Sequence, residues 1–340
     1  MLKIIYQSID MEKIEQINKN ELLFIDLRSP KEYKEHTIPD AINLPVLTDE
    51  SRKVVGRLYK KGLHDEAILK GVESISQDLP EIFEKILDLK RKYKSLILFC
   101  ERGGFRSTSL FVLLKSLHIN VEKLDGGYKA YRKYIVKKLD EEIEKRNFIN
   151  LSGKTGVGKT EILNRIRDLD YSVLDLEALA NHRGSLLGHI GMNEQPDQKM
   201  FESEIYNVLK SSKDLVFIEG ESRRIGTLYI PAKLYEKMNL GIQILVEDSL
   251  ENRVNRIYNE YVDDHDEEIF EALNSLSRYI SKEQLEKYKM AIEKKDYEMV
   301  IRELCVKYYD KNYSIYKKDF DYILQNDENI IKRLIEIANI

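Results

Sequence analysis

Two short segments of this chain carry residues whose types and spacing can do chemistry on phosphate-linked groups. The first begins at Cys100, one of two cysteines in the chain, and reads Cys-Glu-Arg-Gly-Gly-Phe-Arg-Ser through Ser107. The second reads Gly-Lys-Thr-Gly-Val-Gly-Lys-Thr from Gly153 through Thr160. A reactive thiolate and a phosphate-binding loop on one polypeptide predict two chemical steps on one substrate.

The cysteine segment has the composition of a loop that folds around an anion. Converging backbone N–H groups, a helix N-terminus and nearby arginines all stabilise a thiolate. We therefore expect Cys100, Arg102 and Arg106 to be catalytic; an inert buried cysteine, the alternative, leaves the neighbouring arginines and glycines unexplained. The remaining residues of this chalcogen and phosphate loop are Glu101, Gly103, Gly104, Phe105 and Ser107.

Four segments in the first part of the chain together resemble a rhodanese domain. They are Asp26-Leu27-Arg28-Ser29-Pro30, residues 36–45, the cysteine loop and Gly126-Gly127-Tyr128. In that family the cysteine carries a persulfide or its selenium equivalent. The resemblance therefore implies chalcogen transfer.

The spacing of the cysteine loop also fits a second chemistry. Cys100, five residues, then Arg106 and Ser107 match the signature of cysteine-dependent phosphatases, whose loop holds phosphate while the thiolate attacks phosphorus. A short rhodanese loop suits a bare sulfur, whereas this longer one has room for a tetrahedral phosphorus group. A chalcogen still attached to phosphate, such as selenophosphate, would suit both features.

The glycine-rich segment matches the Walker A pattern in full and lies between a predicted strand, 148–152, and a predicted helix, 161–168. Its backbone N–H groups can wrap a diphosphate, Lys159 can offset charge on the outer phosphate, and Thr160 can hold Mg²⁺. The pattern does not choose between a nucleotide and another phosphate ester. The predicted diphosphate-binding residues are Gly153, Lys154, Thr155, Gly156, Val157, Gly158, Lys159 and Thr160.

Two acidic residues at predicted strand ends, Asp175 and Glu219, are candidates for the metal side of this loop. A carboxylate at such a position is equally often a helix cap or part of a solvated turn. Both interpretations therefore stay open.

The composition predicts a globular, soluble chain of two domains. With 340 residues, 42% hydrophobic and 34% charged, there is material for more than one core beneath a charged surface. No apolar run approaches the roughly 20 residues of a membrane span and no signal peptide is evident, so we expect a cytoplasmic protein without a membrane partner. A net charge of −4 does not exclude RNA, because 55 basic residues can form a local basic face.

The apolar runs predict the elements that position the two loops. Runs at 22–25 and 96–99, separated by helical stretches such as 81–90, predict a parallel sheet with Cys100 at its carboxyl end, where ligands bind. Runs at 171–174, 215–218 and 242–246 predict a second parallel sheet, and the sequence after residue 250 is helical in period.

The predicted fold class is α/β: a rhodanese-like parallel-sheet domain followed by a P-loop α/β domain with a helical C-terminal extension. The expected ranges are 1–138 for the rhodanese-like domain, 139–147 for a helical connector, 148–248 for the P-loop α/β domain and 249–340 for the helical C-terminal region.

Two further polar strings, residues 174–185 and 219–226, lie beside predicted strands. With the two loops and their order, they closely resemble the tRNA 2-selenouridine synthase family, over the chain from Asp26 to about Gly226. The resemblance implies a transferase that converts 2-thiouridine at the wobble position of tRNA into 2-selenouridine. The sulfur would first be alkylated by geranyl diphosphate, and the S-geranyl group would then be displaced by selenium from selenophosphate.

On the basis of this resemblance we hypothesise a role for each loop. The Walker loop would bind the diphosphate of the geranyl donor, with Mg²⁺ on Thr160 and no tightly bound cofactor. Cys100 would take selenium from selenophosphate as a selanyl-sulfide, with the loop arginines and glycine amides holding the phosphate. Candidate contacts to tRNA or diphosphate are Asp175, His182, Arg183, Glu219, Arg223 and Arg224.

Two segments are interpreted less fully. Tyrosines between residues 308 and 316 could stack on anticodon bases, although tyrosines at helical spacing more commonly pack in a core. Residues 51–71 look like an insertion in the first domain, with no role assigned.

Two alternative functions stay open on the sequence. One is a fusion of rhodanese and P-loop domains that acts on small molecules as a sulfurtransferase, or as a cysteine phosphatase with a kinase-like domain. The other is a nucleotide-binding regulator that responds to sulfur without turnover.

Overall fold

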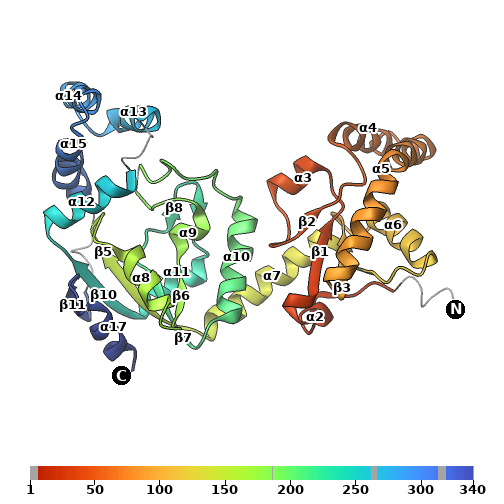
Figure 1. Cartoon of the computed structure of the whole chain (residues 1–340), viewed down its shortest axis with the longest axis horizontal. Helices are drawn as coiled ribbons and strands as arrows, with labels where there is room; N and C mark the ends of the chain where they lie inside the picture. The colour runs from red at the N-terminus through yellow and green to blue at the C-terminus, as the bar shows by residue number, and fades with distance from the viewer. Residues whose placement is uncertain (1–6, 186, 262–265, 313–318, 340) are drawn as a thin grey trace. The chain divides into compact units, whose positions relative to one another are not determined.

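The computed structural model describes residues 7–185, 187–261, 266–312 and 319–339. The chain divides into two compact units, unit 1 over Met1–Lys138 and unit 2 over Leu139–Ile340 (Figure 1). Each unit is a parallel α/β fold with its own core, so the predicted fold class is confirmed. Within the described ranges, no helix combines the length and apolar character needed to cross a bilayer.

Unit 1 is built on a four-stranded parallel sheet in the order β2-β1-β3-β4. Its two central strands pair in register, with Leu23 opposite Leu96 and Asp26 opposite Phe99. These strands are almost entirely buried because helices flank the sheet, which is why they read as apolar runs. The strands are β1 (Leu22–Asp26), β2 (Ile42–Asn43), β3 (Ser95–Phe99) and β4 (Glu122–Lys123).

Six α-helices are described in unit 1 or begin there. The stretch predicted at 81–90 is the end of a much longer helix, α5, which continues through Pro80. Residues 51–71 lie in α4 and the first turns of α5, which pack against each other. The helices are α2 (Met11–Ile14), α3 (Pro30–Glu35), α4 (Asp49–Lys60), α5 (His64–Lys92), α6 (Phe105–Ser116) and α7 (Gly127–Glu144), with a 3-10 turn at Lys19–Glu21.

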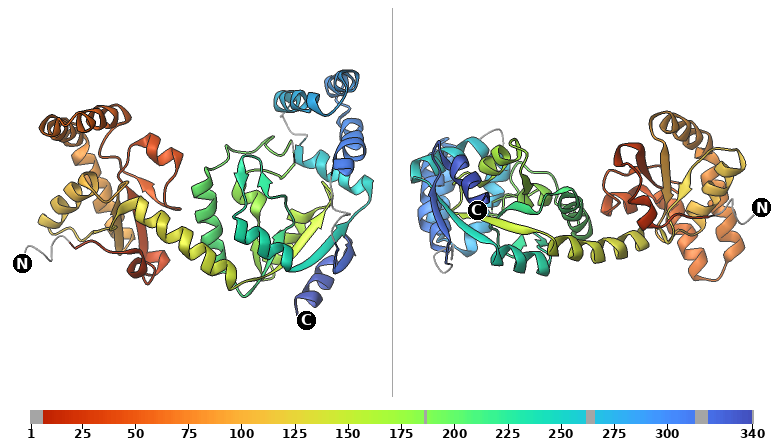
Figure 2. Two further views of the ribbon diagram at one scale, coloured as in Figure 1. Left: turned by 180° about the vertical axis from the view of Figure 1, so that it is seen from behind. Right: turned by 90° about the horizontal axis from the view of Figure 1, so that it is seen from below.

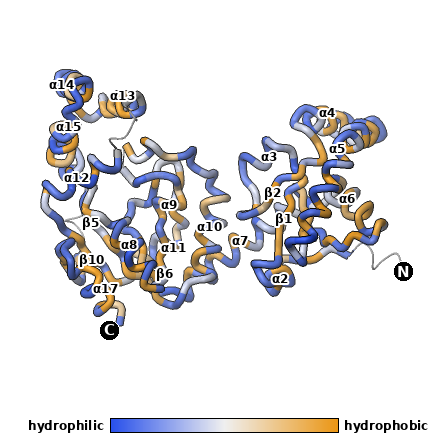
Figure 3. The backbone as a smooth tube through the Cα atoms, viewed as in Figure 1, coloured by the Kyte–Doolittle hydropathy of each residue, from blue (hydrophilic) through white to orange (hydrophobic). Residues whose placement is uncertain are grey.

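Unit 2 contains a five-stranded parallel sheet in the order β11-β10-β5-β7-β6, and Figure 2 shows helices around it from two further directions. Its central strands appear as hydrophobic segments in Figure 3. The strands are β5 (Asn147–Gly153), β6 (Ser172–Leu174), β7 (Leu215–Glu219), β10 (Ile242–Glu247) and β11 (Tyr322–Gln325).

The region predicted as a helical C-terminal extension, 249–340, is mostly helical in its described part but also contains a strand. Strand β11 pairs in parallel with β10 and completes the sheet, and α17 (Ile330–Ala338) packs its apolar face on the same core. β11 is an edge strand of four residues that alternate between half-buried and exposed, and its short apolar segment at 322–324 is not distinctive in a region of helical sequence. The segment 139–147, predicted as a helical connector, comprises the end of α7 and the first residue of β5.

The helices between β10 and β11 form a second core in unit 2. α13, α14 and α15 gather around the buried Tyr288, and Figure 1 shows them together. Tyr308 and Tyr309 pack at its edge with ring centroids 5.2 Å apart, whereas Tyr313 and Tyr316 lie outside the described residues. The remaining elements are α8 (Lys159–Arg167), α9 (Leu176–Ala180), α10 (Gln198–Ser211), β8 (Arg224–Ile225), β9 (Leu228–Tyr229), α11 (Ala232–Leu240), α12 (Leu250–Tyr261), α13 (Asp266–Ser275), α14 (Lys282–Glu293), α15 (Tyr297–Leu304) and α16 (Asp310–Asn312).

Candidate functional site

Cys100 lies directly after β3 and just before α6, at the carboxyl end of the sheet in unit 1. Its Sγ is 3.2 Å from Oγ of Ser107 and 4.0 Å from the carbonyl oxygen of Gly104. The Ser107 hydroxyl can donate to a thiolate, and α6 directs its N-terminus toward the same place. The structure therefore places the sulfur beside a hydroxyl group and at the start of a helix.

The first turn of α7 holds the loop after Cys100 in place. The backbone N–H of Tyr128 donates to the Cys100 carbonyl at 2.9 Å, and that of Lys129 donates to the Glu101 carbonyl at 3.0 Å. Gly127 has a φ of +61°, and a Cβ there would lie 2.2 Å from the Cys100 carbonyl oxygen. This close approach explains why a glycine is required in the Gly-Gly-Tyr motif.

A fully buried ion pair between Arg28 and Asp26 supports the loop after Cys100. Arg28 donates to the carboxylate of Asp26 at 2.7 and 3.0 Å, and its guanidinium lies 4.4 Å from the ring centre of Tyr128. The other end of the guanidinium donates to Glu101 at 3.2 Å. Glu101, which the sequence places in the anion loop, therefore anchors that loop to the sheet.

The two loop arginines have different surroundings. Arg106 donates to both carboxylate oxygens of Glu32, at 2.5 and 3.2 Å, whereas Arg102 is exposed. Burial alone would raise the pKa of Glu32, but the hydrogen bonds and positive charge of Arg106, assisted by Arg52, lower it to about 2. The sequence analysis missed Glu32; its only signal is its position three residues after Ser29, where a capping box forms.

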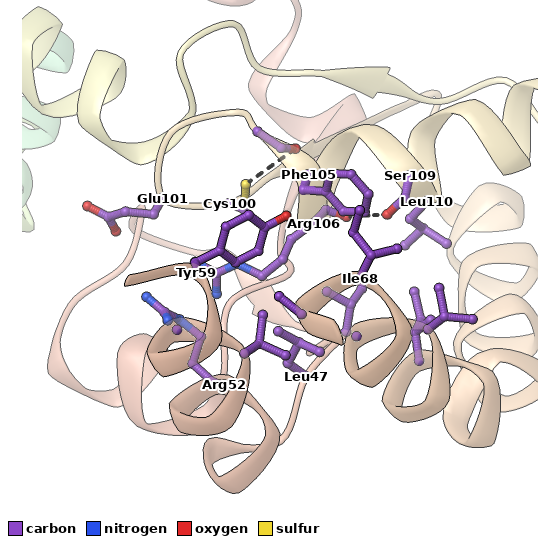
Figure 4. Close-up of a pocket in the computed structure, with 18 of the residues that line it drawn as sticks. Leu47, Arg52, Tyr59, Ile68, Cys100, Glu101, Phe105, Arg106, Ser109 and Leu110 are labelled. Carbon is purple, nitrogen blue, oxygen red and sulfur yellow. Dashed lines mark hydrogen bonds between the residues drawn. The ribbon is translucent and has the colours of Figure 1, made fainter. Parts of the chain in front are cut away.

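A cavity of about 980 Å³ opens beside Cys100, between the cysteine loop, α6 and the helices α4 and α5. Figure 4 shows Tyr59 and Ile68 facing the loop that carries Cys100 and Phe105. The insertion at 51–71, to which the sequence analysis gave no role, supplies much of this wall.

The Walker loop of unit 2 lies between β5 and α8, as predicted. Gly156 and Gly158 have φ values of +80° and +86°, which other residues rarely adopt. This conformation lets successive backbone N–H groups face one anion.

Residues from α12 hold the Walker loop in place. Arg253 donates to the Thr155 carbonyl at 2.9 Å, and Arg256 donates to the Gly156 carbonyl at 3.0 Å. Asp310 pairs with Arg253 at 2.7 Å. The sequence analysis assigned none of these three; the spacing of the two arginines, three residues apart on one helix, is the only signal that could have found them.

Asp310 also accepts a hydrogen bond from Lys154, at 3.1 Å. Lys154 is therefore part of the support of the loop, in addition to its predicted place in the diphosphate cradle.

Buried carboxylates lie beside Lys159 and Thr160, the last two residues of the Walker loop. The Thr160 hydroxyl donates to Oε1 of Glu219 at 3.2 Å, and Nζ of Lys159 is 3.7 Å from Oε1 of Glu221. Burial and the charge of Asp175 raise the pKa of Glu219 to about 8. Of the two candidates for the metal side of the loop, Asp175 and Glu219, it is Glu219 that contacts Thr160.

Glu177 is a further carboxylate of the same cluster, and the sequence analysis gave it no role. Burial and the charges of Glu219 and Glu221 raise its pKa to about 10. The buried Oε1 of Glu221 accepts no hydrogen bond, so this oxygen-rich place fits a cation such as Mg²⁺. In the described part of the chain, no group of three or more His, Cys, Asp or Glu side chains is arranged to hold a metal ion. Bound Mg²⁺ would therefore complete its coordination with water and diphosphate oxygens.

A cavity of about 350 Å³ covers this end of the loop. Its lining includes Lys159 and Thr160 of the Walker loop, together with two of the predicted contact residues, His182 and Arg183. Burial and the nearby His189 lower the pKa of His182, which favours the neutral imidazole. Its Nδ1 is buried without a hydrogen-bond partner.

Four predicted contact residues do not line that cavity: Glu219, described above, and Asp175, Arg223 and Arg224. Asp175 caps α9 by accepting a hydrogen bond from the Ala178 N–H at 2.9 Å. Arg224 donates to the Gly226 carbonyl at 2.7 Å, and Arg223 is exposed. The helix-cap interpretation of Asp175 thus describes its observed contact.

A smaller apolar cavity, of about 60 Å³, adjoins the phosphate cavity. The two share Thr155, Ser185 and Ile257, and the small one is otherwise lined mainly by the apolar cluster of α13, α14 and α15. Cys305 lies in this wall, where burial raises the pKa of its thiol. The second cysteine is therefore part of an apolar packing surface.

Family models match most of the chain. The tRNA 2-selenouridine synthase AAA domain matches residues 146–295, and the rhodanese-like domain matches residues 12–134.

Curated proteins named tRNA 2-selenouridine synthase are similar to the chain. One from Nitrosomonas eutropha is 34% identical over 261 residues, which is 75% of this chain and 67% of that protein. One from Psychromonas ingrahamii is 37% identical over 241 residues (70% and 64%), and one from Pseudomonas fluorescens is 34% identical over 259 residues (75% and 70%). The matched part of the chain thus spans about two thirds of the length of these relatives, 63% in the case of a protein from Nitrosomonas europaea.

Proposed function

The chain belongs to the tRNA 2-selenouridine synthase family, and we propose that it is a transferase that converts wobble 2-thiouridine of tRNA into 2-selenouridine. The proposed co-substrates are geranyl diphosphate and selenophosphate, used in two successive steps. A tRNA substrate implies that the reaction takes place in the cytoplasm.

In the first proposed step, the sulfur at C2 of 2-thiouridine attacks C1 of geranyl diphosphate. The C–O bond breaks, pyrophosphate leaves, and N3 of the base loses its proton. The Walker loop amides and Lys159 stabilise the charge that develops on the departing diphosphate. Mg²⁺ held by Thr160 and Glu219 would supply additional positive charge there.

The observation that carries this step is the apolar cavity that adjoins the phosphate cavity through Thr155, Ser185 and Ile257. A ligand that extends from the phosphates across these residues meets aliphatic side chains such as Leu187 and Ile269. A terpenoid diphosphate has that combination of an anionic head and a hydrocarbon tail. At about 60 Å³ the apolar cavity has to widen when the tail enters.

In the second proposed step, selenium replaces the alkylated sulfur in unit 1. Selenium in selenophosphate is already selenide, so forming the selanyl-sulfide on Cys100 that the family resemblance implies would need an oxidant or would release phosphite. Attack of the Cys100 thiolate on phosphorus needs neither, and it releases HSe⁻. HSe⁻ then adds to C2, its proton passes to N3, and geranyl thiolate leaves, while water releases phosphate from the cysteine.

The experiment tests the contribution of each loop to the two steps separately. Purified variants receive anticodon stem-loop RNA with 2-thiouridine, geranyl diphosphate and selenophosphate, and the nucleosides are identified by mass spectrometry. We expect Cys100→Ser to accumulate S-geranyl-2-thiouridine and Lys159→Ala to make neither product.

Each variant is the control for the other. Lys159→Ala should still convert RNA that already carries S-geranyl-2-thiouridine, which shows that unit 1 is intact. The reverse pattern, with alkylation lost in Cys100→Ser, would refute the assignment of the loops. ATP turnover without RNA would instead favour the kinase-like alternative.

A further inference from the structure

The cavity beside Cys100 is much larger and more apolar than an inorganic anion needs. Its volume is about 980 Å³, and aliphatic side chains of α4 and α5 such as Val55, Ile68 and Ile75 form the wall opposite the cysteine loop. Phosphate or selenophosphate would use only the loop end of this space. Concave, mostly apolar cavities of this size bind ligands with a substantial hydrocarbon part.

Several large apolar side chains at this cavity are left partly in solvent. Tyr59 is 39% exposed, Val72 is 53% exposed and Phe105 is 60% exposed, and all three line the cavity. They come from α4, α5 and α6, so three separate elements direct apolar surface to one place. Such a cluster marks a binding surface more often than isolated exposed residues do.

We propose that this cavity receives the alkyl group carried on the C2 sulfur of the nucleoside, so that the carbon to be attacked by selenium is held beside Cys100. This inference rests on the proposed function and deepens it, because it assigns the insertion at 51–71 a substrate. The S-geranyl group is the apolar ligand that the proposed first step delivers. Each methylene that it buries strengthens binding roughly fourfold.

The charges at the mouth of the cavity fit an RNA substrate. Lys53, Arg57 and Lys60 of α4 line the cavity and are exposed, as is Arg102 of the cysteine loop. Cations at such positions contact phosphates next to the modified nucleoside and fix its register. The apolar interior and the basic rim are thus complementary to an alkylated nucleoside within an RNA chain.

The bonds involved are the same as in the proposed second step. The C2–Se bond forms, the C2–S bond breaks, and the electron pair leaves with the sulfur as an alkyl thiolate. The proton of HSe⁻ passes to N3, so no oxidant or reductant is consumed. The cavity retains the hydrocarbon part of the leaving group while its sulfur departs from C2.

The test uses the full chain and RNA stem-loops that carry S-methyl-, S-dimethylallyl- or S-geranyl-2-thiouridine. With selenophosphate, kcat/KM for 2-selenouridine formation should rise at least tenfold from the methyl to the geranyl substrate. Ile68→Glu, which puts a carboxylate on the cavity wall, should remove that rise. Leu69→Glu is the matched control, because the neighbouring residue is 64% exposed and does not line the cavity.

Binding without turnover gives a second measurement. In the Cys100→Ser background, the wild-type cavity should bind S-geranyl RNA at least tenfold more tightly than S-methyl RNA, and Ile68→Glu should bind both equally. Ile68→Ala, which introduces no charge, should show a smaller loss in the same direction and guards against misfolding of the glutamate variant.

Two results would overturn the inference. One is a wild-type enzyme that converts methyl and geranyl substrates at equal kcat/KM, which would leave the proposed two-step function standing without this cavity. The other is an Ile68→Glu variant that slows both substrates by the same factor. A wild-type enzyme that transfers no selenium to any S-alkyl RNA would reject the proposed function itself.

Discussion

Arg106 and Glu32 form a two-point ion pair, with the guanidinium of Arg106 donating to both carboxylate oxygens of Glu32 at 2.5 and 3.2 Å. Arg106 lies in the first turn of α6, and Glu32 lies in α3, 74 residues earlier. Arg106, which is predicted to bind an anion, is therefore held in place by a carboxylate. An incoming phosphate has to share the positive charge of Arg106 with Glu32.

The ion pair predicts a defined acid sensitivity. The pKa of Glu32 falls from 4.5 to about 2 on folding, so its stabilisation is complete above the unfolded pKa and is lost as the pH falls from 4.5 to 2. We expect Glu32→Gln to lower the free energy of unfolding by about 1 to 2 kcal/mol at pH 7, after allowance for solvent screening, and by much less at pH 2.

Urea titrations at the two pH values measure this change. The exposed Glu35, also in α3, gives the control variant Glu35→Gln, which should leave the free energy of unfolding within about 0.5 kcal/mol at both pH values. An equal loss in Glu32→Gln at pH 7 and pH 2 would contradict the assignment.

Gly127 gives a prediction for the cysteine loop itself. Its Cβ would lie 2.2 Å from the Cys100 carbonyl oxygen and 2.4 Å from the Gly103 nitrogen, at a φ of +61°. Gly127→Ala should destabilise unit 1 by about 2 kcal/mol or more and displace the loop, because backbone atoms cannot move aside cheaply. Selenium transfer should fall while alkylation in unit 2 continues.

Gly71→Ala is the control for that substitution. Gly71 lies within α5, and nothing lies within 4 Å of an added Cβ. The variant should be neutral or more stable by up to about 1 kcal/mol, since alanine favours the helix. Thermal unfolding followed by circular dichroism separates these two stability outcomes, and the two product assays are applied to Gly127→Ala itself, where the loss should be confined to selenium transfer.

The two loops could be predicted from the sequence because each follows an apolar strand and has a local pattern. Cys100 after β3 and Gly153 at the end of β5 are found where the sequence places them. The partners of these loops could not be predicted in the same way. Glu32 and Arg253 reach them across 74 and 98 residues, respectively, and no short pattern encodes such contacts.

The same limit applies to the last strand of unit 2. Asn326 follows β11 and donates to the Val157 carbonyl at 2.7 Å, across 169 residues. Since β11 has only four residues and its sequence does not alternate between polar and apolar residues, the three-dimensional pairing with β10 is what identifies the strand.

The packing of α17 predicts how much this C-terminal segment contributes to stability. Leu334 is fully buried against the core of the sheet. Leu334→Ala should cost about 2 to 5 kcal/mol, because it leaves a cavity in the core that α17 shares with the sheet of unit 2. Ile323→Ala removes a side chain that is 61% exposed on β11 and should cost less than about 1 kcal/mol.

Hydrogen exchange of peptides from β5 and β10 reports on this unit alone. Leu334→Ala should raise the exchange of those amides, whereas peptides from β1 and β3 of unit 1 should be unchanged. Equal exchange in Leu334→Ala and Ile323→Ala would mean that α17 is not part of the cooperative core of unit 2.

The hydrogen bond between Thr160 and Glu219 predicts a metal requirement confined to one step. Thr160→Val keeps the shape of the side chain but removes the hydroxyl that lies 3.2 Å from Oε1 of Glu219 and that would bind Mg²⁺. Alkylation of 2-thiouridine RNA by geranyl diphosphate should fall by about 100-fold, since the departing diphosphate loses part of its charge compensation. A chelator added to the wild-type enzyme should have a similar effect, and added Mg²⁺ should reverse the effect of the chelator but not that of the substitution.

RNA that already carries the S-geranyl group provides the internal control, because its conversion by selenophosphate depends on Cys100 and should change by less than about twofold. If the chelator slows both steps alike, the metal acts on the RNA or on selenophosphate and not at Thr160.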